Sequence, residues 1–145
     1  MSAENCVFCR IAAGDIPSAK VYEDDQVIAF LDLAPVHPGH VLVVPKEHYA
    51  DILGFPAECA AAVCGAVQKV AAAQMKALGA TGVNVLQNNG AAAGQAVFHI
   101  HWHVIPRFDG DGLRLWNQKS YGDGEMLQTA EKLAAAINDS SRAEA

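Results

Sequence analysis

The sequence predicts an α+β domain built around an antiparallel sheet of about five strands, with one long helix and one C-terminal helix. Apolar runs of strand length follow one another across short turns, a connection that antiparallel strands allow. Two helical segments stand apart in the chain, without the regular alternation of strand and helix that indicates a parallel sheet. The 145 residues, 52% of them hydrophobic, suffice for one compact domain and are few for two.

The chain begins with a short helix expected over residues 6–14, followed by a hairpin. The hairpin pairs Lys20–Glu23 with Val27–Asp32 across the acidic turn at Asp24 and Asp25. Both of its arms are rich in the apolar and aromatic residues that strands favour. They supply the first two strands of the sheet.

A Pro/Gly-rich turn then leads into a third strand, His40–Val44, which Pro45 ends. The strand does not alternate between apolar and polar residues, so we expect both of its faces to be buried. A short helix is expected around His48–Leu53.

A long helix is expected from Pro56, in its first turn, to Leu78, with Gly79 as the C-terminal stop. Apolar residues recur along it at helical spacing, while Gln68 and Lys69 lie elsewhere. The predicted buried face consists of Val63, Cys64, Val67, Val70, Ala71 and Leu78.

Two more strands, over residues 82–88 and 97–105, complete the sheet, with a Gly-rich turn between them. A C-terminal helix follows from the helical spacing of Met126, Ala130, Leu133 and Ile137. We expect a single domain over residues 1–138 and a frayed tail over residues 139–145.

Composition and charge exclude several classes of protein. The net charge is −6 and no Lys/Arg cluster occurs, so a binder of duplex nucleic acid is not expected. The N-terminus does not resemble a secretory signal, and the long apolar stretch over residues 57–75 carries charges that exclude a bilayer span. Four cysteines without such a signal are expected to be reduced thiols. The sequence therefore predicts a cytoplasmic protein without a membrane partner.

Three of the six histidines occupy alternate positions in "FHIHWHVIP": His99, His101 and His103. In a strand these side chains would share one face and start about 6.5–7 Å apart. One zinc ion with Zn–N bonds of about 2.1 Å could not collect all three. Three histidines with three separate tasks fit this spacing better than a three-histidine metal site, although a merely polar face remains an alternative.

Imidazole titrates near neutral pH, so it can serve as a nucleophile, a donor or an acid. The middle residue, His101, has a histidine on each side and is the best placed to act as a nucleophile whose tautomer a carbonyl or a second histidine holds. The Gly-rich segment "NNGAAAGQAV" just before it is either an anion-binding nest of backbone N–H groups or an ordinary turn.

These residues resemble the histidine triad (HIT) superfamily, whose signature is His-φ-His-φ-His-φ-φ with φ apolar; "HIHWHVI" fits every position. The stretches "FCRIAAGDIPSAKVYEDDQVIAFLDLAPVHPGHVLVVPKEH" and "NNGAAAGQAVFHIHWHVIPR" extend the resemblance, which is to the Hint-type branch and its bacterial relatives. It implies a HIT-like fold whose sheet continues across a homodimer. It also implies binding of a purine nucleotide, AMP, GMP or a derivative, through the α-phosphate.

The resemblance implies hydrolysis of nucleoside 5′-phosphoramidates through a nucleotidyl-histidine intermediate. The residue matching the nucleophile is His101, His103 matches the contact to the phosphate, and His99 matches the histidine that orients the site. The remaining matches are positions of the nucleotide pocket: Val7, Phe8, Ile11, Phe30, Asp32, Leu33, Asn88, Gly94, Gln95, Ala96 and Val97.

Taken alone, some of these residues have other interpretations. Val7, Ile11 and Leu33 are apolar residues that a core would equally accommodate. Asp32 ends an apolar strand and needs polar partners, either a ligand hydroxyl or a turn N–H. Relatives often carry serine where this chain has Ala96, so the leaving group is in question.

Two other functions therefore stay open beside the phosphoramidate hydrolase. One is a dinucleoside polyphosphate hydrolase, and the other is a non-catalytic protein that senses nucleotides or acts as a scaffold. No catalytic cofactor is expected for any of the three.

Cys6 and Cys9 have the spacing of half a tetrahedral zinc site. His48 and His99 are the candidates for the other half, and bacterial relatives that this chain resembles hold structural zinc in such a set. Plain thiols on a short helix are the alternative. A catalytic zinc is disfavoured, because four protein ligands leave no position for water.

Other polar and aromatic residues are given structural roles. Cys64 is expected in the core. His37 and His40 flank Pro-Gly and are interpreted as turn residues. The segment "LRLWNQKSY", residues 113–121, is expected at a dimer interface or near the partner's site.

Overall fold

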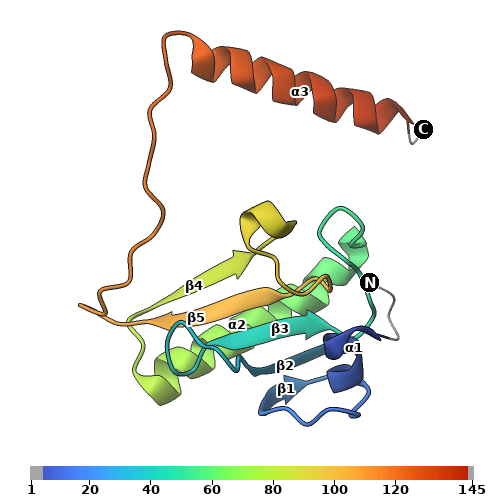
Figure 1. Ribbon diagram of the computed structural model, residues 1–145, viewed down its shortest axis with the longest axis vertical. Coiled ribbons are helices and arrows are strands. Elements are labelled where there is room, and N and C mark those ends of the chain that lie inside the picture. The colour runs from blue at the N-terminus through green and yellow to red at the C-terminus, as the bar shows by residue number, and fades with distance from the viewer. Residues whose placement is uncertain (1–4, 144–145) are drawn as a thin grey trace. The chain divides into compact units, whose positions relative to one another are not determined.

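The structure, a computed structural model, describes residues 5–143. It divides into two compact units, residues 1–111 and residues 112–145. The first unit contains the whole sheet and the hydrophobic core on each of its two faces (Figure 1). The expectation of one domain over residues 1–138 stays a prediction.

Five strands form one antiparallel sheet in the order β1-β2-β3-β5-β4, which confirms the predicted fold class. Neighbours in the chain are neighbours in the sheet except at β5, which lies between β3 and β4 (Figure 1). The strands are β1 (Lys20–Glu23), β2 (Val27–Leu31), β3 (Val41–Pro45), β4 (Gly82–Gln87) and β5 (Trp102–Arg107).

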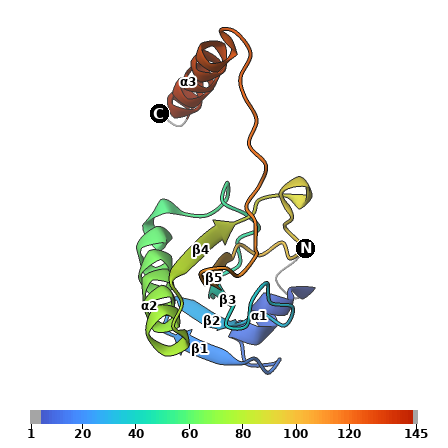
Figure 2. The ribbon, with the colours of Figure 1, turned by 90° about the vertical axis from the view of Figure 1, so that its left-hand side faces the viewer.

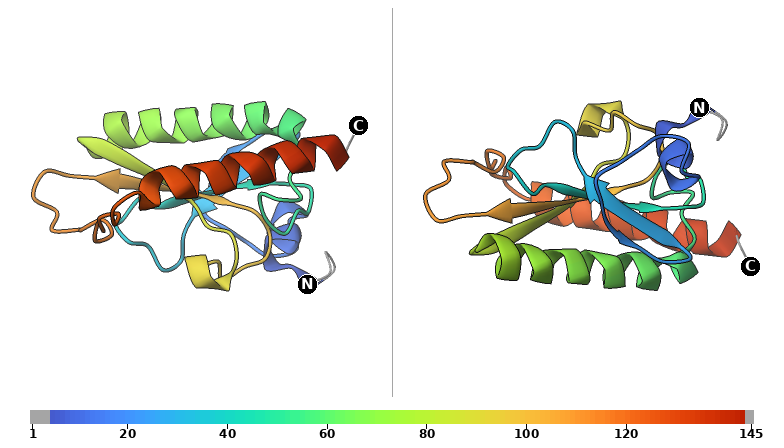
Figure 3. Two further views of the ribbon diagram at one scale, coloured as in Figure 1. Left: turned by 90° about the horizontal axis from the view of Figure 1, so that it is seen from above. Right: turned by 90° about the horizontal axis from the view of Figure 1, so that it is seen from below.

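The two faces of the sheet are covered by different helices (Figure 2). The long helix α2 (Ala60–Leu78) covers one face and contacts all five strands, as the view from below also shows (Figure 3). The short helix α1 (Val7–Ala12) packs on the other face. Two 3-10 turns, η2 (Ala57–Cys59) and η3 (Ala91–Ala93), complete the unit.

Alternate residues of β2 and β3 enter two separate cores. Val27 and Val43 pack with Val63 and Val70 of α2, while Ile28 and its neighbours pack against the α1 side. Every residue of β3 is buried. The continuous apolar strand is therefore buried on both faces, as predicted.

The predicted helix around His48–Leu53 is wrong, because this segment forms turns. The Asp51 carboxylate accepts the N–H of Leu53 at 2.9 Å, and the N–H of Ile52 donates to Asn89 Oδ1 at 2.8 Å. A short side chain that captures nearby backbone N–H groups competes with helix formation.

The last predicted strand begins late: β5 starts at Trp102 rather than at residue 97. The N–H of Ile100 donates to the carbonyl of Tyr49 at 2.7 Å, so this backbone bonds to a loop and not to a neighbouring strand. Of the three triad histidines only His103 lies in β5, and the assumption that all three share one strand face is wrong.

Helix α2 has the predicted extent apart from its first turn, and Gly79 ends it in the left-handed conformation (φ 69°). Its buried stripe is Val63, Ala66, Val70 and Gln74. Cys64 is exposed and Leu78 is half exposed, so the core position predicted for Cys64 is wrong. Each residue turns the helix by about 100°, which carries position 64 away from the stripe through position 63.

The second unit contains α3 (Glu125–Ala143), which includes the predicted C-terminal helix. Met126, Leu127, Leu133 and Ile137 on it are each at least 60% exposed. Residues 139–143 continue the helix, and residues 144–145 of the expected tail lie outside the described residues; fraying of the tail stays a prediction. No helix among residues 5–143 is both long and apolar enough to cross a membrane.

Candidate active site and metal-ligand cluster

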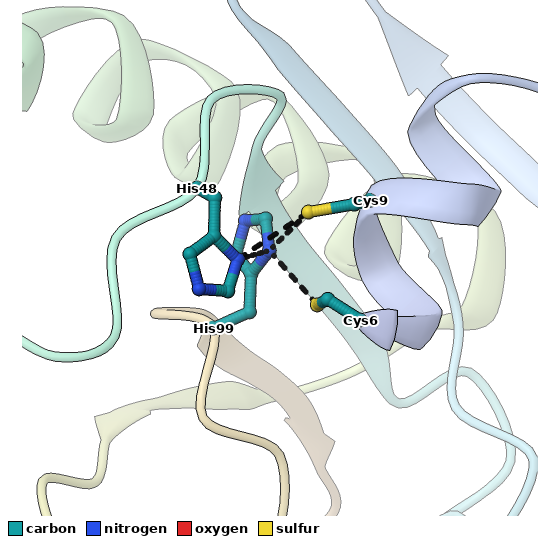
Figure 4. Close-up of side chains that lie close together, drawn as sticks. All are labelled: Cys6, Cys9, His48 and His99. Carbon is teal, nitrogen blue, oxygen red and sulfur yellow. Dashed lines mark hydrogen bonds between the residues drawn. The ribbon is translucent and has the colours of Figure 1, made fainter. Parts of the chain in front are cut away.

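Four side chains from three distant parts of the chain meet at one point: Cys6, Cys9, His48 and His99 (Figure 4). The cysteines lie at and just before the start of α1, His48 follows β3, and His99 precedes β5. The Nδ1 atom of His99 lies 3.4 Å from Cys6 Sγ, 3.5 Å from Cys9 Sγ and 3.2 Å from His48 Nδ1. Cys9 Sγ lies 3.3 Å from His48 Nδ1.

The far side of the His99 ring fixes its tautomer. Its Nε2 lies 2.8 Å from the carbonyl oxygen of Pro45, and a carbonyl only accepts, so Nε2 carries the proton. Nδ1 then presents a lone pair to the two sulfurs and to His48. Burial lowers the pKa of His99 to about 4, which keeps the ring neutral at pH 7. This is the state in which histidine binds a metal.

The donor set fits zinc. Tetrahedral zinc with Zn–S bonds of about 2.3 Å and Zn–N bonds of about 2.1 Å places its ligand atoms about 3.3–3.8 Å apart. The four measured separations among the two sulfurs and two Nδ1 atoms span 3.2 to 3.5 Å. All four ligand atoms lie within 4.8 Å of one another, so the cluster can hold a metal ion with four protein ligands.

A cavity of about 450 Å³ opens on the α1 side of the sheet, next to this cluster. Its walls are mainly apolar, and its polar groups include one carboxylate and two triad histidines. The lining residues are Val7, Phe8, Ile11, Ile16, Pro17, Ser18, Ala19, Phe30, Leu31, Asp32, Leu33, Ala34, Leu42, Gly94, Ala96, Val97, His101 and His103.

His101 lines this cavity with a defined tautomer. Its Nδ1 lies 2.7 Å from the carbonyl oxygen of His99, so Nδ1 carries the proton and Nε2 holds the lone pair. The ring of Phe8 packs edge-on against it, with the ring centroids 5.1 Å apart. Burial lowers the pKa of His101 below its ordinary value, so the ring is neutral at pH 7. A neutral imidazole with one nitrogen fixed as donor is a competent nucleophile at the other.

His103 is hydrogen-bonded to His40, which the sequence analysis interpreted as a turn residue. His40 Nε2 lies 2.9 Å from His103 Nδ1. The N–H of Val36 donates to His40 Nδ1 at 3.2 Å, so His40 carries its proton on Nε2 and donates to His103. His103 must then carry its own proton on Nε2, and it is a donor at that atom. His40 does end the predicted turn, since its N–H donates to the His37 carbonyl at 2.9 Å, and its side chain has this further partner, which the turn interpretation did not include.

Burial and the neighbouring histidines lower the pKa of His103 to about 4. Burial likewise lowers the pKa of His40, against the opposing charge of Asp32. Both rings of this pair are therefore neutral at pH 7, which the chain of single-proton hydrogen bonds requires.

Asp32 lies beside this pair at the edge of the cavity. Its Oδ1 accepts the N–H of Ala34 at 2.9 Å. Of the two partners considered for this carboxylate, a ligand hydroxyl and a turn N–H, the turn N–H is therefore present. Its Oδ2 lies 3.7 Å from His40 Nδ1. Asp32, His40 and His103 could also be grouped as metal ligands, but the two imidazoles use their facing nitrogens in a hydrogen bond with each other.

Comparison with known proteins decides the family. Residues 13–110, more than half of the chain, match the HIT domain. The chain belongs to the HIT family. It is 47% identical over 137 residues to Protein hit of Bacillus subtilis, with 93% of each chain covered.

Two relatives carry the name of an activity. The chain is 47% identical over 135 residues to the adenosine 5′-monophosphoramidase hnt1 of Schizosaccharomyces pombe, covering 92% of this chain and 98% of that one. It is 45% identical over 116 residues to the adenylylsulfatase HINT3 of Arabidopsis thaliana, covering 80% of this chain and 58% of that one. Nucleotide hydrolases thus occur among close relatives in the family.

Solved structures of HIT proteins share the fold. A HIT family protein from Bacillus subtilis superposes with a TM-score of 0.83 at 44% identity, covering 90% of this chain and 96% of that one. A zinc-bound histidine triad family protein from Mycobacterium smegmatis gives a TM-score of 0.75 at 38% identity, covering 93% and 99%.

In this HIT chain most of the residues expected around the nucleotide line one cavity, and two do not. Asn88 is not in the lining. Gln95 is buried and joins two loops: its Nε2 donates to the Ala50 carbonyl, in the segment after β3, at 2.7 Å, and its Oε1 accepts the N–H of Gly90, in its own loop, at 2.8 Å. It shapes the loop before the triad, and a nucleotide contact from either residue stays a prediction.

The apolar members of the set differ in burial. Phe8 and Phe30 are buried in the core on the α1 side, and Ile11 is partly buried against it. Leu33 is fully exposed and Val7 is 39% exposed. Exposed apolar side chains around a cavity favour a ligand face over a core. The core interpretation is therefore wrong for Val7 and Leu33, while Ile11 packs against the core and also lines the cavity.

The Gly-rich segment before the triad is a turn. The N–H groups of Ala93, Gly94 and Gln95 donate to carbonyls of Gly90 and Ala91 inside it, so they are already satisfied. Gly94 has a φ of 86° and lines the cavity with its backbone. Of the two interpretations, the hydrogen bonds of these residues favour the turn.

Proposed function

We propose that this protein hydrolyses purine nucleotide derivatives at the α-phosphate, with nucleoside 5′-phosphoramidates as the substrate class. The observation that carries the proposal is the state of His101. It is a buried neutral imidazole whose Nδ1–H is held by a backbone carbonyl and whose ring lines a nucleotide-sized cavity. The named activity of the Schizosaccharomyces pombe relative supports the same substrate class.

In the first step the Nε2 lone pair of His101 forms a bond to the α-phosphorus, and the bond from phosphorus to the amine breaks. The positive charge that develops on His101 is stabilised by its Nδ1–H bond to the His99 carbonyl. The leaving amine takes up a proton from water, while the Nε2–H of His103, which the hydrogen bond from His40 holds in place, donates a hydrogen bond to the phosphate that is being transferred.

In the second step water forms a bond to the same phosphorus, and the bond to His101 Nε2 breaks. This water loses a proton to solvent, which balances the proton that the amine took up in the first step, and the products are the nucleoside monophosphate, the free amine and the neutral enzyme. Every group in this sequence belongs to the chain, the substrate or water, so no catalytic cofactor is required.

The apolar half of the cavity suits a purine base. Phe8 and Phe30 form an edge-to-face pair with centroids 5.6 Å apart, and the exposed apolar residues lie at the rim. The Asp32 carboxylate also lines the cavity, and we assign it as the acceptor for ribose hydroxyls. His103 supplies a donor to the phosphate.

The Cys6–Cys9–His48–His99 cluster is proposed as a structural zinc site. Its four ligands, the tautomer of His99 and the existence of a zinc-bound relative from Mycobacterium smegmatis support this assignment. Zinc there would fix the position of His99, whose carbonyl holds His101. With four protein ligands the ion would have no open position for substrate.

We further propose a cytoplasmic homodimer in which the sheet continues from one copy to the other. Strand β4 is an edge of the sheet, and an edge strand offers a row of backbone groups for pairing. The four cysteines are free thiols, as a reducing compartment would keep them.

The test is release of AMP from adenosine 5′-phosphoramidate by wild type and by His101→Ala, each with and without a chelator. Release by wild type, abolished in the variant and maintained in the short term under chelation, is the expected result. Immediate loss of AMP release when the chelator is added to wild type would instead indicate that the metal is catalytic.

The leaving group is open to a second candidate, because Ala96 lines the cavity without a hydroxyl to assist an amine. A dinucleoside polyphosphate is therefore assayed beside the phosphoramidate, since its phosphate leaving group needs less help from a proton donor. AMP binding with turnover of neither substrate would contradict the hydrolase proposal and favour a nucleotide sensor.

A further inference from the structure

Helix α2 carries one buried polar side chain, Gln74, on the face that packs against the sheet. Only 3% of this residue is exposed. Its Nε2 donates to the carbonyl oxygen of Gly39 and to the carbonyl oxygen of Val104, both at 2.8 Å. Carbonyl oxygens only accept, so the amide nitrogen must be the atom between them.

The two carbonyls belong to the residues next to the hydrogen-bonded histidines. Gly39 immediately precedes His40, and Val104 immediately follows His103. One NH₂ group thus joins the backbone on both sides of the 2.9 Å contact between His40 Nε2 and His103 Nδ1. It is a bridge between the turn before β3 and the middle of β5, the two segments that carry the pair.

Gln74 acts from behind the sheet. Val104, whose carbonyl it binds, packs with Val70 of α2, whereas His103 lines the cavity on the opposite face. Gln74 is absent from the lining of that cavity. It can influence the reacting groups only through the backbone.

Gly39 lies in a conformation that favours glycine, with a φ of 94°. A Cβ added to it would lie 2.4 Å from Leu78 Cδ1, the end of a flexible side chain of α2. The turn therefore lies against α2 at the point where the Gln74 amide binds the Gly39 carbonyl.

The other end of the amide is not satisfied. Gln74 Oε1 is buried and has no hydrogen-bond partner among the described residues. A buried acceptor without a partner is unfavourable, so a side chain chosen only for packing would be apolar here. The presence of an amide despite this cost indicates that its two N–H bonds contribute something that an apolar side chain could not.

We propose that Gln74 is a positioning residue for the reaction: it holds His40 and His103 at hydrogen-bonding distance from behind the sheet. The inference rests on the proposed function for its kinetic consequence. Its geometric content, the dependence of the His40–His103 bond on Gln74, does not require that function.

The variant that tests it is Gln74→Met, which keeps the length and volume of the side chain and removes both N–H groups. Val70→Ala is the matched control, because it weakens the same helix face without removing either hydrogen bond to the carbonyls of Gly39 and Val104. Both variants are measured for Tm, for kcat and KM on adenosine 5′-phosphoramidate, and for the imidazole ¹⁵N and N–H proton resonances of His40 and His103.

In Gln74→Met we expect kcat to fall about tenfold with KM within about twofold, the pattern of a misplaced reacting group. The bonded imidazole proton between His40 and His103 should shift or disappear. In Val70→Ala, at a comparable loss of Tm, kcat and the imidazole resonances should stay those of wild type.

The inference is overturned if Gln74→Met leaves the imidazole resonances unchanged, or if its loss of kcat is no larger than that of Val70→Ala. If Gln74→Met does not fold, Gln74→Asn, which keeps the amide on a shorter stem, replaces it in the same comparison. If wild type itself turns over no substrate, the proposed function fails, and the resonances alone decide the inference.

Discussion

Two pairs of histidines lie on either side of His101, and they are built differently. In one pair the facing nitrogens of His48 and His99 are 3.2 Å apart, with two cysteine sulfurs within 3.5 Å of His99. In the other, His40 and His103 face each other at 2.9 Å with a backbone N–H behind His40.

The two pairs differ in whether they need a further group to complete their contacts. His99 offers a lone pair to atoms that are themselves ligands, so that cluster is completed by an electrophile such as a metal ion. The His40–His103 pair has one proton for each contact and needs no further group. The same residue type thus serves as a metal-ligand candidate on one side of His101 and as a hydrogen-bond donor on the other.

The largest effect is expected from removing one ligand of the Cys6–Cys9–His48–His99 cluster. Cys9→Ser should abolish stoichiometric zinc binding and lower Tm by about 10 °C, which corresponds to about 3 kcal/mol for a domain of this size. Zinc content by atomic emission and Tm by calorimetry measure it. Cys64→Ser removes an exposed thiol outside the cluster and should change neither. Full zinc occupancy in Cys9→Ser would contradict the four-ligand assignment.

Breaking the donor pair should affect rate more than stability. His40→Leu removes the proton donor to His103 and should lower kcat about 30-fold, or about 2 kcal/mol, while zinc content stays unchanged. His40→Gln keeps an amide N–H near the same place and should recover part of the rate. Equal rates for these two variants would count against a role of the hydrogen bond.

The His40–His103 pair should also contribute to the pH dependence of stability. Burial lowers the pKa of His103 to about 4, from 6.5 in the unfolded chain. As pH falls from 6.5 toward 4 the unfolded chain binds a proton that the folded chain does not, so stability falls; below about 4 this contribution is constant.

His103→Asn removes that contribution and leaves the metal-ligand cluster in place. The free energy of unfolding in urea should therefore depend less steeply on pH between 6.5 and 4 in the variant than in wild type. Parallel curves for the two proteins would show that His103 is not neutral in the folded state.

The smallest effect is expected at Ala96, which lies in the cavity outside both pairs. Ala96→Ser adds a hydroxyl near the leaving group and should raise kcat/KM for phosphoramidates about threefold, which is under 1 kcal/mol. Turnover of a dinucleoside polyphosphate serves as the control and should change less. A larger gain for the polyphosphate would reverse the proposed role of the hydroxyl.

The sequence predicted what depends on local pattern. The hairpin, the buried β3 strand and the end of α2 at Gly79 follow from alternation, apolar runs and a glycine stop, and all are confirmed. The Cys-x-x-Cys spacing and the triad indicate three residues of the cluster, Cys6, Cys9 and His99, and the resemblance to relatives that hold zinc adds His48.

The failures around the triad have one cause, which is contact between distant segments. The strand through His99 and His101 is broken because Ile100 bonds to Tyr49, 51 residues earlier. His40 sits in a Pro-Gly turn, and only the pairing of β3 with β5 brings it to His103. Gln74 was not distinguished from the other polar residues of its helix, since nothing local reveals the carbonyls it meets.

The cluster joins residues 6 and 9 to residues 48 and 99, and this has a consequence for protein synthesis. The two cysteines leave the ribosome first, and the last ligand follows 90 residues after Cys9. At about 5–20 residues per second the thiols wait several seconds before their histidine exists. During that interval the thiols are exposed to oxidants and to non-cognate metal ions. The nascent chain therefore depends on a reducing environment more than the folded protein does.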